Sequence, residues 1–332
     1  MRSDVFFLVC LGIGGAVFAA AVAFGNDYLF FAGYVVAQYV AVATAWNILG
    51  GYCGYVNFGS AAFFALGAYT TVAFYSFYPP LPIPALIVVG GAVSGVVGLG
   101  MGYLMLRLRG AFFAIATLAL AVVLQTLVVN WDYVGGSRGA YIMRPETMAP
   151  LGNYVRYLFL VMLFLAVVAI TTARLIERSR LGYGFATIRD DELAAEASGV
   201  PTLRLKLVAT AISGALMGMA GAPFPYYISY LQPSSTFGLD YAVNAIAMPL
   251  IGGTTTWVGP LVGAVLLGSL QQIATVTISS AVNLLIVGFL LVGFVIVAPN
   301  GIVGLFRQHI QHKPAGIVGR RRLGADAAGS AP

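Results

Sequence analysis

Residues 110–130 read GAFFAIATLALAVVLQTLVVN, a run without a single charged side chain. About 20 apolar residues suffice for a helix that crosses the ~30 Å hydrocarbon core of a bilayer. Similar apolar runs lie before and after this one in the sequence. Residues 28–106 and 241–306 contain no Asp, Glu, Lys, Arg or His. Only 8% of the chain is charged, against roughly 25% in soluble domains. The composition therefore excludes a soluble domain and predicts a membrane protein.

Ten apolar segments predict an all-α, polytopic transmembrane helix bundle with about eight to ten spans. The N-terminal run 5–24 is long for the apolar part of a signal peptide, so we expect an uncleaved first helix. The run 241–252 is too short to span alone, so it is either extended by its neighbours or a half-helix. The predicted segments are 5–24, 28–49, 61–78, 85–106, 110–130, 157–173, 207–224, 241–252, 258–278 and 282–298.

The basic residues predict the orientation, because cytoplasmic loops of membrane proteins are enriched in Lys and Arg. With ten crossings and a cytoplasmic N-terminus, fourteen of the 17 basic residues fall in cytoplasmic loops or termini. Arg138, Arg144 and Arg156 fall outside. Both termini are then cytoplasmic, and membrane orientation accounts for the net charge of +6 without nucleic-acid binding.

One stretch concentrates the charge: six of the 17 basic and five of the 11 acidic residues lie between Arg174 and Lys206. We expect a permease domain over residues 1–306 that contains this cytoplasmic loop, 174–206. Residues 307–332 then form a disordered cytoplasmic tail, because they are rich in small and basic residues.

The chain shows no energy source of its own. No ionisable residue lies in the middle of a predicted span, where ion-coupled carriers and pumps usually place one. Neither lysine ends a Gly-x-x-x-x-Gly-Lys-Ser/Thr nucleotide motif. No cluster suggests a metal site, a cofactor or a catalytic nucleophile. We therefore expect a non-enzymatic pore subunit that a separate protein drives through the charged loop.

A short helix is predicted inside that loop, between Arg189 and Gly199. Acidic residues at its start favour the positive end of a helix, and Gly199 followed by Val200-Pro201 ends it. Such a helix suits a groove in a partner protein, and a solvated loop helix is the alternative. The candidate coupling residues are Arg189, Asp190, Asp191, Glu192, Glu196 and Gly199.

Glycines suggest two further features. Small residues recur every four positions at Gly90, Ser94, Gly98 and Gly102, and again at Gly214, Gly218 and Ala222, which is typical of close helix packing. Two Gly-rich breaks, 50–59 and 252–260, each precede an apolar helix. They are either matching broken helices of a transporter repeat or two ordinary cytoplasmic turns.

Several ordered motifs resemble the inner-membrane permeases of ABC importers, and in particular the LivM type of branched-chain amino-acid permease. The resemblance covers residues 28–306. Its motifs are GYCGYVNFGSAAFFALGAY (51–69), RGAFFAIATLA (109–119), GGS (135–137), SRLGYGFATIRDDELAAEASG (179–199) with Lys206, Gly252-Gly253 with Gly259-Pro260, and PNG (299–301).

The chain departs from the family pattern at two places. Tyr55, Asn57 and Ser60 stand where the family often has Gln, Ser and His. Thr254-Thr255-Thr256 stands where Leu-Gly-Ser often precedes the last Gly-Pro motif. These departures leave the identity of the substrate open.

The resemblance implies ATP-driven import of branched-chain or similar amino acids across the bacterial inner membrane. It implies two ATPase subunits, a second homologous permease and a periplasmic binding protein as partners. Permeation of urea, an amide or another small polar solute, and a stand-alone secondary carrier or channel, are the alternatives. The candidate path residues are Asn57, Ser60, Gln125, Asn130, Asn244 and Thr255, each of which could instead form a helix–helix hydrogen bond.

Overall fold

The structure is a computed structural model that describes residues 3–77, 81–105, 108–143, 147–148, 152–277, a few positions between 285 and 293, and 301–305. The helices are α1 (Ser3–Phe24), α2 (Asp27–Asn47), α3 (Ser60–Phe77), α4 (Ile83–Met105), α5 (Ala111–Val129), α6 (Tyr154–Glu177), α7 (Arg180–Asp190), α8 (Glu192–Ala197), α9 (Thr202–Gly221), α10 (Phe224–Ile228), α11 (Pro233–Thr236), α12 (Leu239–Gly252) and α13 (Val258–Thr277).

Short elements complete the described part. A π-helical turn, Ile48–Tyr52, follows α2, and two 3-10 turns, Asp132–Val134 and Gly136–Arg138, follow α5. Two antiparallel strand pairs have two residues in each strand: β1 (Ala140–Tyr141) with β4 (Tyr230–Leu231), and β2 (Thr147–Met148) with β3 (Gly152–Asn153).

The predicted all-α, polytopic class is confirmed. Seven helical segments in the described part of the chain are long and apolar enough to cross a membrane. They are Ser3–Phe24, Asp27–Tyr52, Ile83–Leu104, Ala111–Val129, Tyr154–Glu177, Thr202–Ile228 and Val258–Val276. Two shorter apolar helices, α3 and α12, match the predicted runs 61–78 and 241–252. The predicted tail 307–332 lies outside the described residues. The predicted span 282–298 also lies outside them, except for a few isolated positions.

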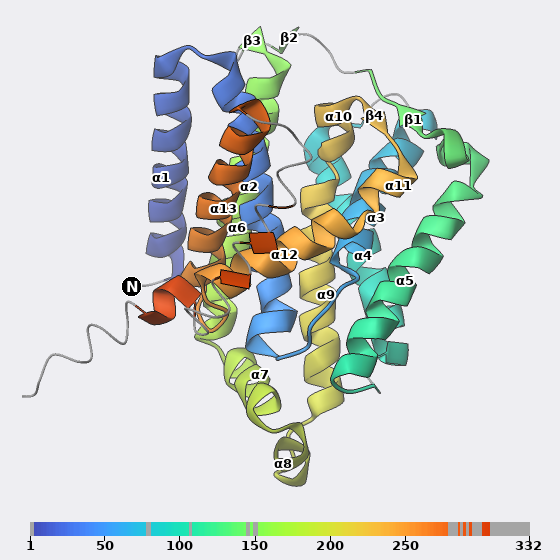
Figure 1. The fold of residues 1–332 in the computed structure, drawn as a ribbon, viewed down its shortest axis with the longest axis vertical. Helices are drawn as coiled ribbons and strands as arrows, with labels where there is room; N and C mark the ends of the chain where they lie inside the picture. Colours follow the sequence, from blue (N-terminus) through green and yellow to red (C-terminus); the bar gives the residue numbers. More distant parts are fainter. Residues whose placement is uncertain are drawn as a thin grey trace, which may run out of the picture.

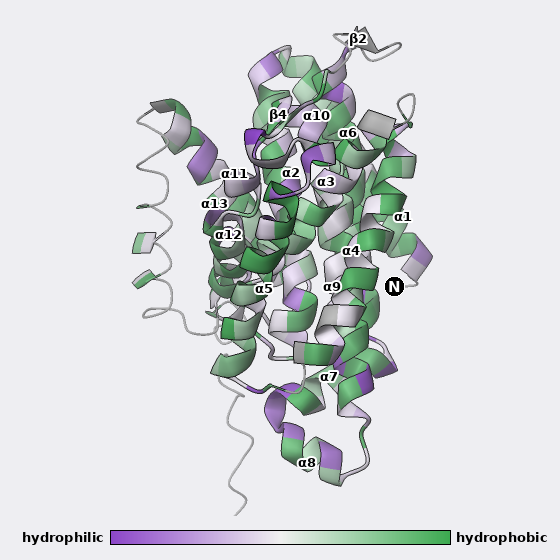
Figure 2. Cartoon of the chain, turned by 90° about the vertical axis from the view of Figure 1, so that its right-hand side faces the viewer, coloured by the Kyte–Doolittle hydropathy of each residue, from purple (hydrophilic) through white to green (hydrophobic). Residues whose placement is uncertain are grey.

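The long helices run roughly along one axis, with α9 near the middle and α1 and α5 at opposite margins (Figure 1). Helix α9 packs most extensively on α4 and also on α3, while α2 packs on α6 and α13. Apolar residues cover the length of the bundle, and polar residues gather at its ends, notably on α7 and α8 (Figure 2). The strand pair β1–β4 lies at the end opposite to α8 (Figure 1).

The two small-residue stripes pack against each other, which confirms the packing interpretation for α4 and α9. A Cβ atom added at Gly218 would lie 2.6 Å from the Gly90 carbonyl oxygen and would also overlap the Ser94 side chain. A Cβ atom at Gly98 would lie 3.3 Å from the Thr210 carbonyl oxygen. Only small residues allow two backbones to approach this closely, and in lipid such packing contributes much of the attraction between helices.

The charged stretch 174–206 is more helical than expected from its composition. Helix α6 continues beyond the predicted apolar run 157–173 as far as Glu177, and α9 begins at Thr202, before the predicted run 207–224. Charged side chains can reach water at the end of a span while the backbone keeps its helical hydrogen bonds. Apolar runs therefore locate the membrane crossing more closely than they locate the ends of a helix.

We predict that Gly218→Ala lowers the free energy of unfolding by about 1–3 kcal/mol, because the new methyl group overpacks the α4–α9 contact. Gly100→Ala on α4 is the matched control, since nothing lies within 4 Å of a Cβ atom there. Thermal unfolding of the two variants in detergent measures the difference. Equal transition temperatures would contradict the close packing of α4 and α9.

Candidate functional site

The charged stretch folds as two short helices, α7 and α8, between α6 and α9 (Figure 1). Ser179 caps the start of α7 by accepting a hydrogen bond from the Gly182 amide at 3.4 Å. Asp191 has an extended backbone and caps α8 by accepting a hydrogen bond from the Ala194 amide at 3.1 Å. The predicted helix thus begins at Glu192, because Asp191 interrupts the helical backbone between α7 and α8.

Gly199 ends α8 as expected. Its φ of +83° lies in the left-handed region that favours glycine. The Gly199 amide donates to the Glu196 carbonyl at 2.9 Å, and the Val200 amide donates to the Ala195 carbonyl at 3.0 Å. These two bonds form a Schellman motif, which turns the chain towards α9.

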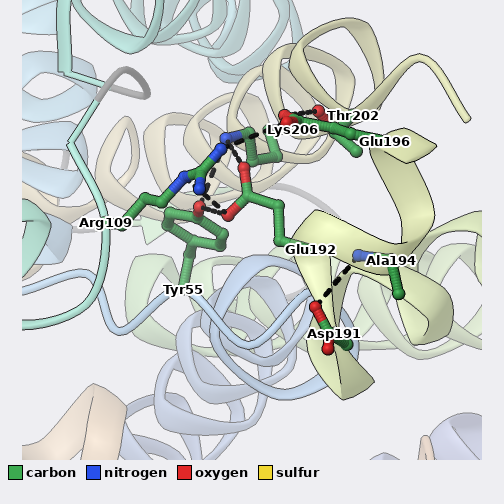
Figure 3. A network of polar contacts seen from close by, with 8 residues as sticks. All are labelled: Tyr55, Arg109, Asp191, Glu192, Ala194, Glu196, Thr202 and Lys206. Atoms are coloured by element: carbon green, nitrogen blue, oxygen red, sulfur yellow. Dashed lines mark hydrogen bonds and ion pairs between the residues drawn. The ribbon is translucent and has the colours of Figure 1, made fainter.

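Glu192 holds α8 against the bundle (Figure 3). The Lys206 ammonium of α9 lies 2.6 Å from Glu192 Oε1, and the Tyr55 hydroxyl donates a hydrogen bond to Glu192 Oε2. Lys206 Nζ also donates to the Tyr55 oxygen at 3.2 Å. The Lys206 side chain is 3% exposed and that of Glu192 12%. Glu192 was predicted as a coupling residue, and the structure places its carboxylate on the inner side of α8.

The surroundings keep the Glu192 carboxyl ionised and the Tyr55 hydroxyl protonated at neutral pH. Burial raises the pKa of the Glu192 carboxyl, but the hydrogen bonds from Lys206 and Tyr55 and the charge of Arg109 outweigh burial and lower it below its usual value. Burial and the adjacent carboxylate raise the pKa of Tyr55, so its hydroxyl stays protonated and can donate. Because the Glu192 pKa is lowered, the pair stabilises the fold at neutral pH, and this contribution is lost as the pH falls through that pKa.

A more exposed group of contacts surrounds the buried pair (Figure 3). Arg109, which lies between α4 and α5, reaches Glu196 Oε2 at 3.2 Å and Glu192 Oε2 at 3.7 Å. The Thr202 hydroxyl donates to Glu196 Oε1 at 2.7 Å. The side chains of Arg109 and Glu196 are 49% and 42% exposed, so water screens their attraction and limits their contribution.

The last turn of α7 contacts the first Gly-rich break. Arg189 Nη1 donates to the Gly51 carbonyl at 3.5 Å, and Asp190 pairs with Arg189 at 3.4 Å. A Cβ atom at Gly54 would lie 3.2 Å from Arg189 Cα, so glycine allows α7 to approach the break. Arg189 thus belongs to the junction between α7 and this break, and Asp190 is joined to it only through Arg189.

A second carboxylate, Glu177 at the end of α6, joins the two Gly-rich breaks. Its Oε2 atom accepts hydrogen bonds from the Trp257 amide at 2.8 Å and from the Tyr52 hydroxyl at 3.4 Å. The breaks also meet directly, since a Cβ atom at Gly51 would lie 2.6 Å from the Thr254 carbonyl oxygen. The similarity between the two breaks predicted neither this contact nor the role of Glu177.

Residues 28–295 match the protein family described as "Branched-chain amino acid transport system / permease component". The chain belongs to this permease family.

Curated relatives agree with the family match. The permease is 27% identical to the high-affinity branched-chain amino acid transport system permease protein LivM of Salmonella typhimurium, over 83% of this chain and 70% of the relative. It is 25% identical to LivM of Escherichia coli K12, over 85% and 72% of the two chains. The ribose import permease protein RbsC of Haemophilus influenzae is 24% identical over 58% and 59%. No solved structure gives a significant match.

These relatives and the seven apolar helices identify an ABC-type permease that crosses the bacterial inner membrane several times. The predicted family is therefore confirmed. The relatives are membrane permease subunits rather than enzymes.

Two candidate path residues lie close together where the first break meets α3. The Asn57 side-chain oxygen accepts a hydrogen bond from the Gly59 amide at 2.7 Å, and its carbonyl accepts from Trp46 Nε1 at 2.8 Å. Ser60 begins α3 and is 1% exposed, and its hydroxyl has no partner among the described residues. Asn57 therefore shapes the break, while the Ser60 hydroxyl is available for a further contact.

The other four path candidates lie in two places, with Gln125 and Asn130 on α5 or at its end and Asn244 and Thr255 on α12 and the turn after it. Asn244 accepts a hydrogen bond from Gln271 at 2.8 Å between α12 and α13, which is the helix–helix contact considered as its alternative. Asn130 ends α5 and donates to the Thr126 carbonyl at 2.8 Å. Thr255 is exposed in the turn between α12 and α13. Gln125 lines a cavity of about 290 Å³ between α5, the first break and the segment from α11 to α12.

The cavity beside Gln125 is mostly apolar. Its wall includes Phe58 of the break, Ala121 of α5 and Leu239 of α12, with Ser234 of α11 as a second polar side chain. Small-solute sites typically combine an apolar wall with a few polar groups. Of the six path candidates, Gln125 has the surroundings that best suit contact with a solute.

Sequence reasoning did not assign roles to three residues that make the principal contacts, Tyr55, Arg109 and Glu177. A usable signal existed for the buried pair. Lys206 lies four residues into α9, followed by an apolar run that begins at Leu207, and a cation buried at such a depth requires a nearby anion. The charged loop offered several acidic residues, so the identity of the anion needed the fold.

We predict that Glu192→Gln loosens α8, because the buried Lys206 ammonium loses its counter-charge at a cost of up to about 3–5 kcal/mol. Amide hydrogen exchange over residues 191–205 should become faster in the detergent-solubilised permease. Glu196→Gln on the same helix is the control. It should change the free energy of opening that governs amide exchange by less than about 1 kcal/mol. Equal exchange in the two variants would refute the role of the Glu192–Lys206 pair.

Proposed function

We propose that this permease is the membrane-spanning subunit of an ATP-driven importer for branched-chain or similar amino acids. It receives the substrate from a periplasmic binding protein and releases it into the cytoplasm. The observation that supports this most directly is the build of α8. One side of this short helix is held against the bundle through Glu192, while Leu193 beside it is 63% exposed.

A firmly held helix with an exposed apolar residue suits docking into a groove of a partner. We assign that groove to ATPase subunits, two of which would complete the transporter together with a second homologous permease. Tyr183 on α7 is 70% exposed at the same end of the bundle. The six coupling candidates then divide by role: Asp191 and Gly199 shape α8, and Glu192 and Glu196 hold it. Arg189 contacts the break, and Asp190 pairs with Arg189.

The excess of basic residues in the predicted inner loops supports a cytoplasmic position for α7 and α8. The opposite end, with the strand pair β1–β4, then faces the periplasm and the binding protein. This arrangement separates the two tasks of the permease, which are to receive a solute at one end and to respond to the ATPases at the other.

Branched-chain amino acids are the preferred substrate class for two reasons. The LivM relatives match more of the chain than the ribose permease does, 83% against 58%. The cavity of about 290 Å³ beside Gln125 has a mainly apolar wall, which suits an aliphatic side chain better than a sugar. Sugars, urea or an amide would need more polar partners than Gln125 and Ser234 supply.

Import driven by separate ATPases is preferred over a stand-alone carrier because of the charge pattern. Residues 28–106 and 241–306 carry no ionisable Asp, Glu, Lys, Arg or His, although ion-coupled carriers commonly place such residues inside their helices. A secondary carrier or channel would transport solute into liposomes that lack ATP and partner subunits, whereas the proposed importer would not.

We predict that Leu193→Asp abolishes co-purification of the ATPase subunits, because a charge on the exposed side of α8 disfavours an apolar groove. The tagged permease is expressed with the proteins encoded beside it, and bound subunits are identified in mild detergent. Met143→Asp is the control, since Met143 is 84% exposed and closely follows β1, which lies at the end of the bundle opposite to α8. Normal recovery of ATPases by the Leu193 variant would argue against docking on α8.

We predict that the complete transporter takes up leucine, that isoleucine and valine compete, and that ribose and urea do not. Gln125→Leu should raise the KM for leucine by up to about tenfold, because the loss of one net hydrogen bond to the solute weakens binding by about that factor. Thr126→Val is the control on the same helix, because the Thr126 hydroxyl bonds the Val122 carbonyl of α5. If ribose or urea competes with leucine and isoleucine does not, the proposed substrate class is wrong.

A further inference from the structure

The break between α2 and α3 is held by the charged segment along most of its length. Glu177 accepts a hydrogen bond from Tyr52, Arg189 contacts the carbonyl of Gly51, and Glu192 accepts from Tyr55. The break itself contains a π-helical turn, a departure from α-helix that is frequent at functional sites. The part of the chain proposed to meet the ATPases is thereby joined to an irregular segment of the membrane bundle.

Tyr55 connects three helices in this junction. Its hydroxyl donates to Glu192 of α8 and accepts from Lys206 of α9. Its ring packs edge-on against Phe113 of α5, with centroids 5.0 Å apart and an interplanar angle of 88°. The residue is 7% exposed. A single buried side chain therefore contacts α5, α8 and α9 while it belongs to the break.

The break continues from Tyr55 to the wall of the cavity. The Phe58 amide donates to Thr117 Oγ1 of α5 at 3.1 Å. Phe113 and Thr117 are one helical turn apart, so Tyr55 and Phe58 contact the same side of α5. Phe58 and the next turns of α5, including Ala121 and Gln125, line the cavity. A continuous series of contacts thus joins α8 to the candidate solute cavity.

We propose that Tyr55 is the positioning residue that makes the break and α5 move together with α8 during transport. This inference rests on the proposed function, because it requires that ATPases move α8. The hydroxyl is the decisive group. Without it, the Glu192–Lys206 pair still holds α8 to α9, and the ring can still pack on Phe113, but α8 loses its hydrogen bond to the break.

Tyr55→Phe tests this link with the smallest change available. The complete transporter, with ATPases, partner permease and binding protein, is reconstituted in liposomes, and leucine uptake and ATP hydrolysis are measured in the same vesicles. We expect assembly and hydrolysis to be retained while uptake per ATP hydrolysed falls about fivefold or more, the usual scale of coupling between two sites. Tyr34→Phe is the control, because the buried Tyr34 hydroxyl has no partner among the described residues.

A double-mutant cycle shows whether Tyr55 acts through Glu192. In that case Tyr55→Phe combined with Glu192→Gln has the same uptake per ATP as Glu192→Gln alone. If uptake per ATP in the double variant instead falls by the product of the two single-variant factors, the proposal is overturned. An unchanged uptake-to-hydrolysis ratio in Tyr55→Phe, or a parallel fall of assembly, hydrolysis and uptake, would also overturn it.

The wild-type transporter in the same liposomes tests the proposed function separately. If it binds ATPases and takes up leucine with ATP, the proposed function stands whatever Tyr55→Phe does. Wild type that binds no ATPase, or transports without ATP, refutes the proposed function itself.

Discussion

Hydrocarbon offers no hydrogen-bond partners, and this constraint governs the permease from its backbone to its charged segment. Each spanning segment must satisfy its own backbone groups, so the described spans are helical. Since lipid is as apolar as the helix surfaces, association must come from close packing and a few polar contacts. The small-residue contact between α4 and α9 is an example of close packing. The Asn244–Gln271 hydrogen bond is an example of a polar contact between helices.

The same constraint explains why the charges gather at the ends of the bundle and why the buried pair near α8 needs close partners. Taking Glu192 and Lys206 out of water is costly, and the cost is offset only by close contact and additional hydrogen bonds. Tyr55 supplies such bonds to both charged groups. The three contacts join α8 to α9 and to the break, so the pair fixes how α8 lies against the bundle.

Irregular backbone occurs where glycine permits it and protein covers it. The breaks 50–59 and 252–260 meet at Gly51 and Thr254, and Glu177 binds groups from both. Irregular segments inside membrane bundles are tolerated where protein or a cavity surrounds them, and transporters often use them at the site of solute passage. The contact between the breaks is consistent with either a repeat or two separate turns, since short Gly-rich sequences serve both.

By itself, the sequence determined the fold class, the approximate position of nine apolar helices, and the end of α8 at Gly199. These features are local, because apolar run length and glycine conformation depend on neighbouring residues. Only the tertiary structure decided that Glu192 faces Lys206 and Tyr55, and that Glu177 joins the two breaks. It also decided that Asn244 pairs with Gln271. Of the path candidates, it placed only Gln125 in the wall of the cavity beside Phe58. Such partners lie up to 137 residues apart, and several polar residues could have satisfied each one, so their choice depends on how the helices pack.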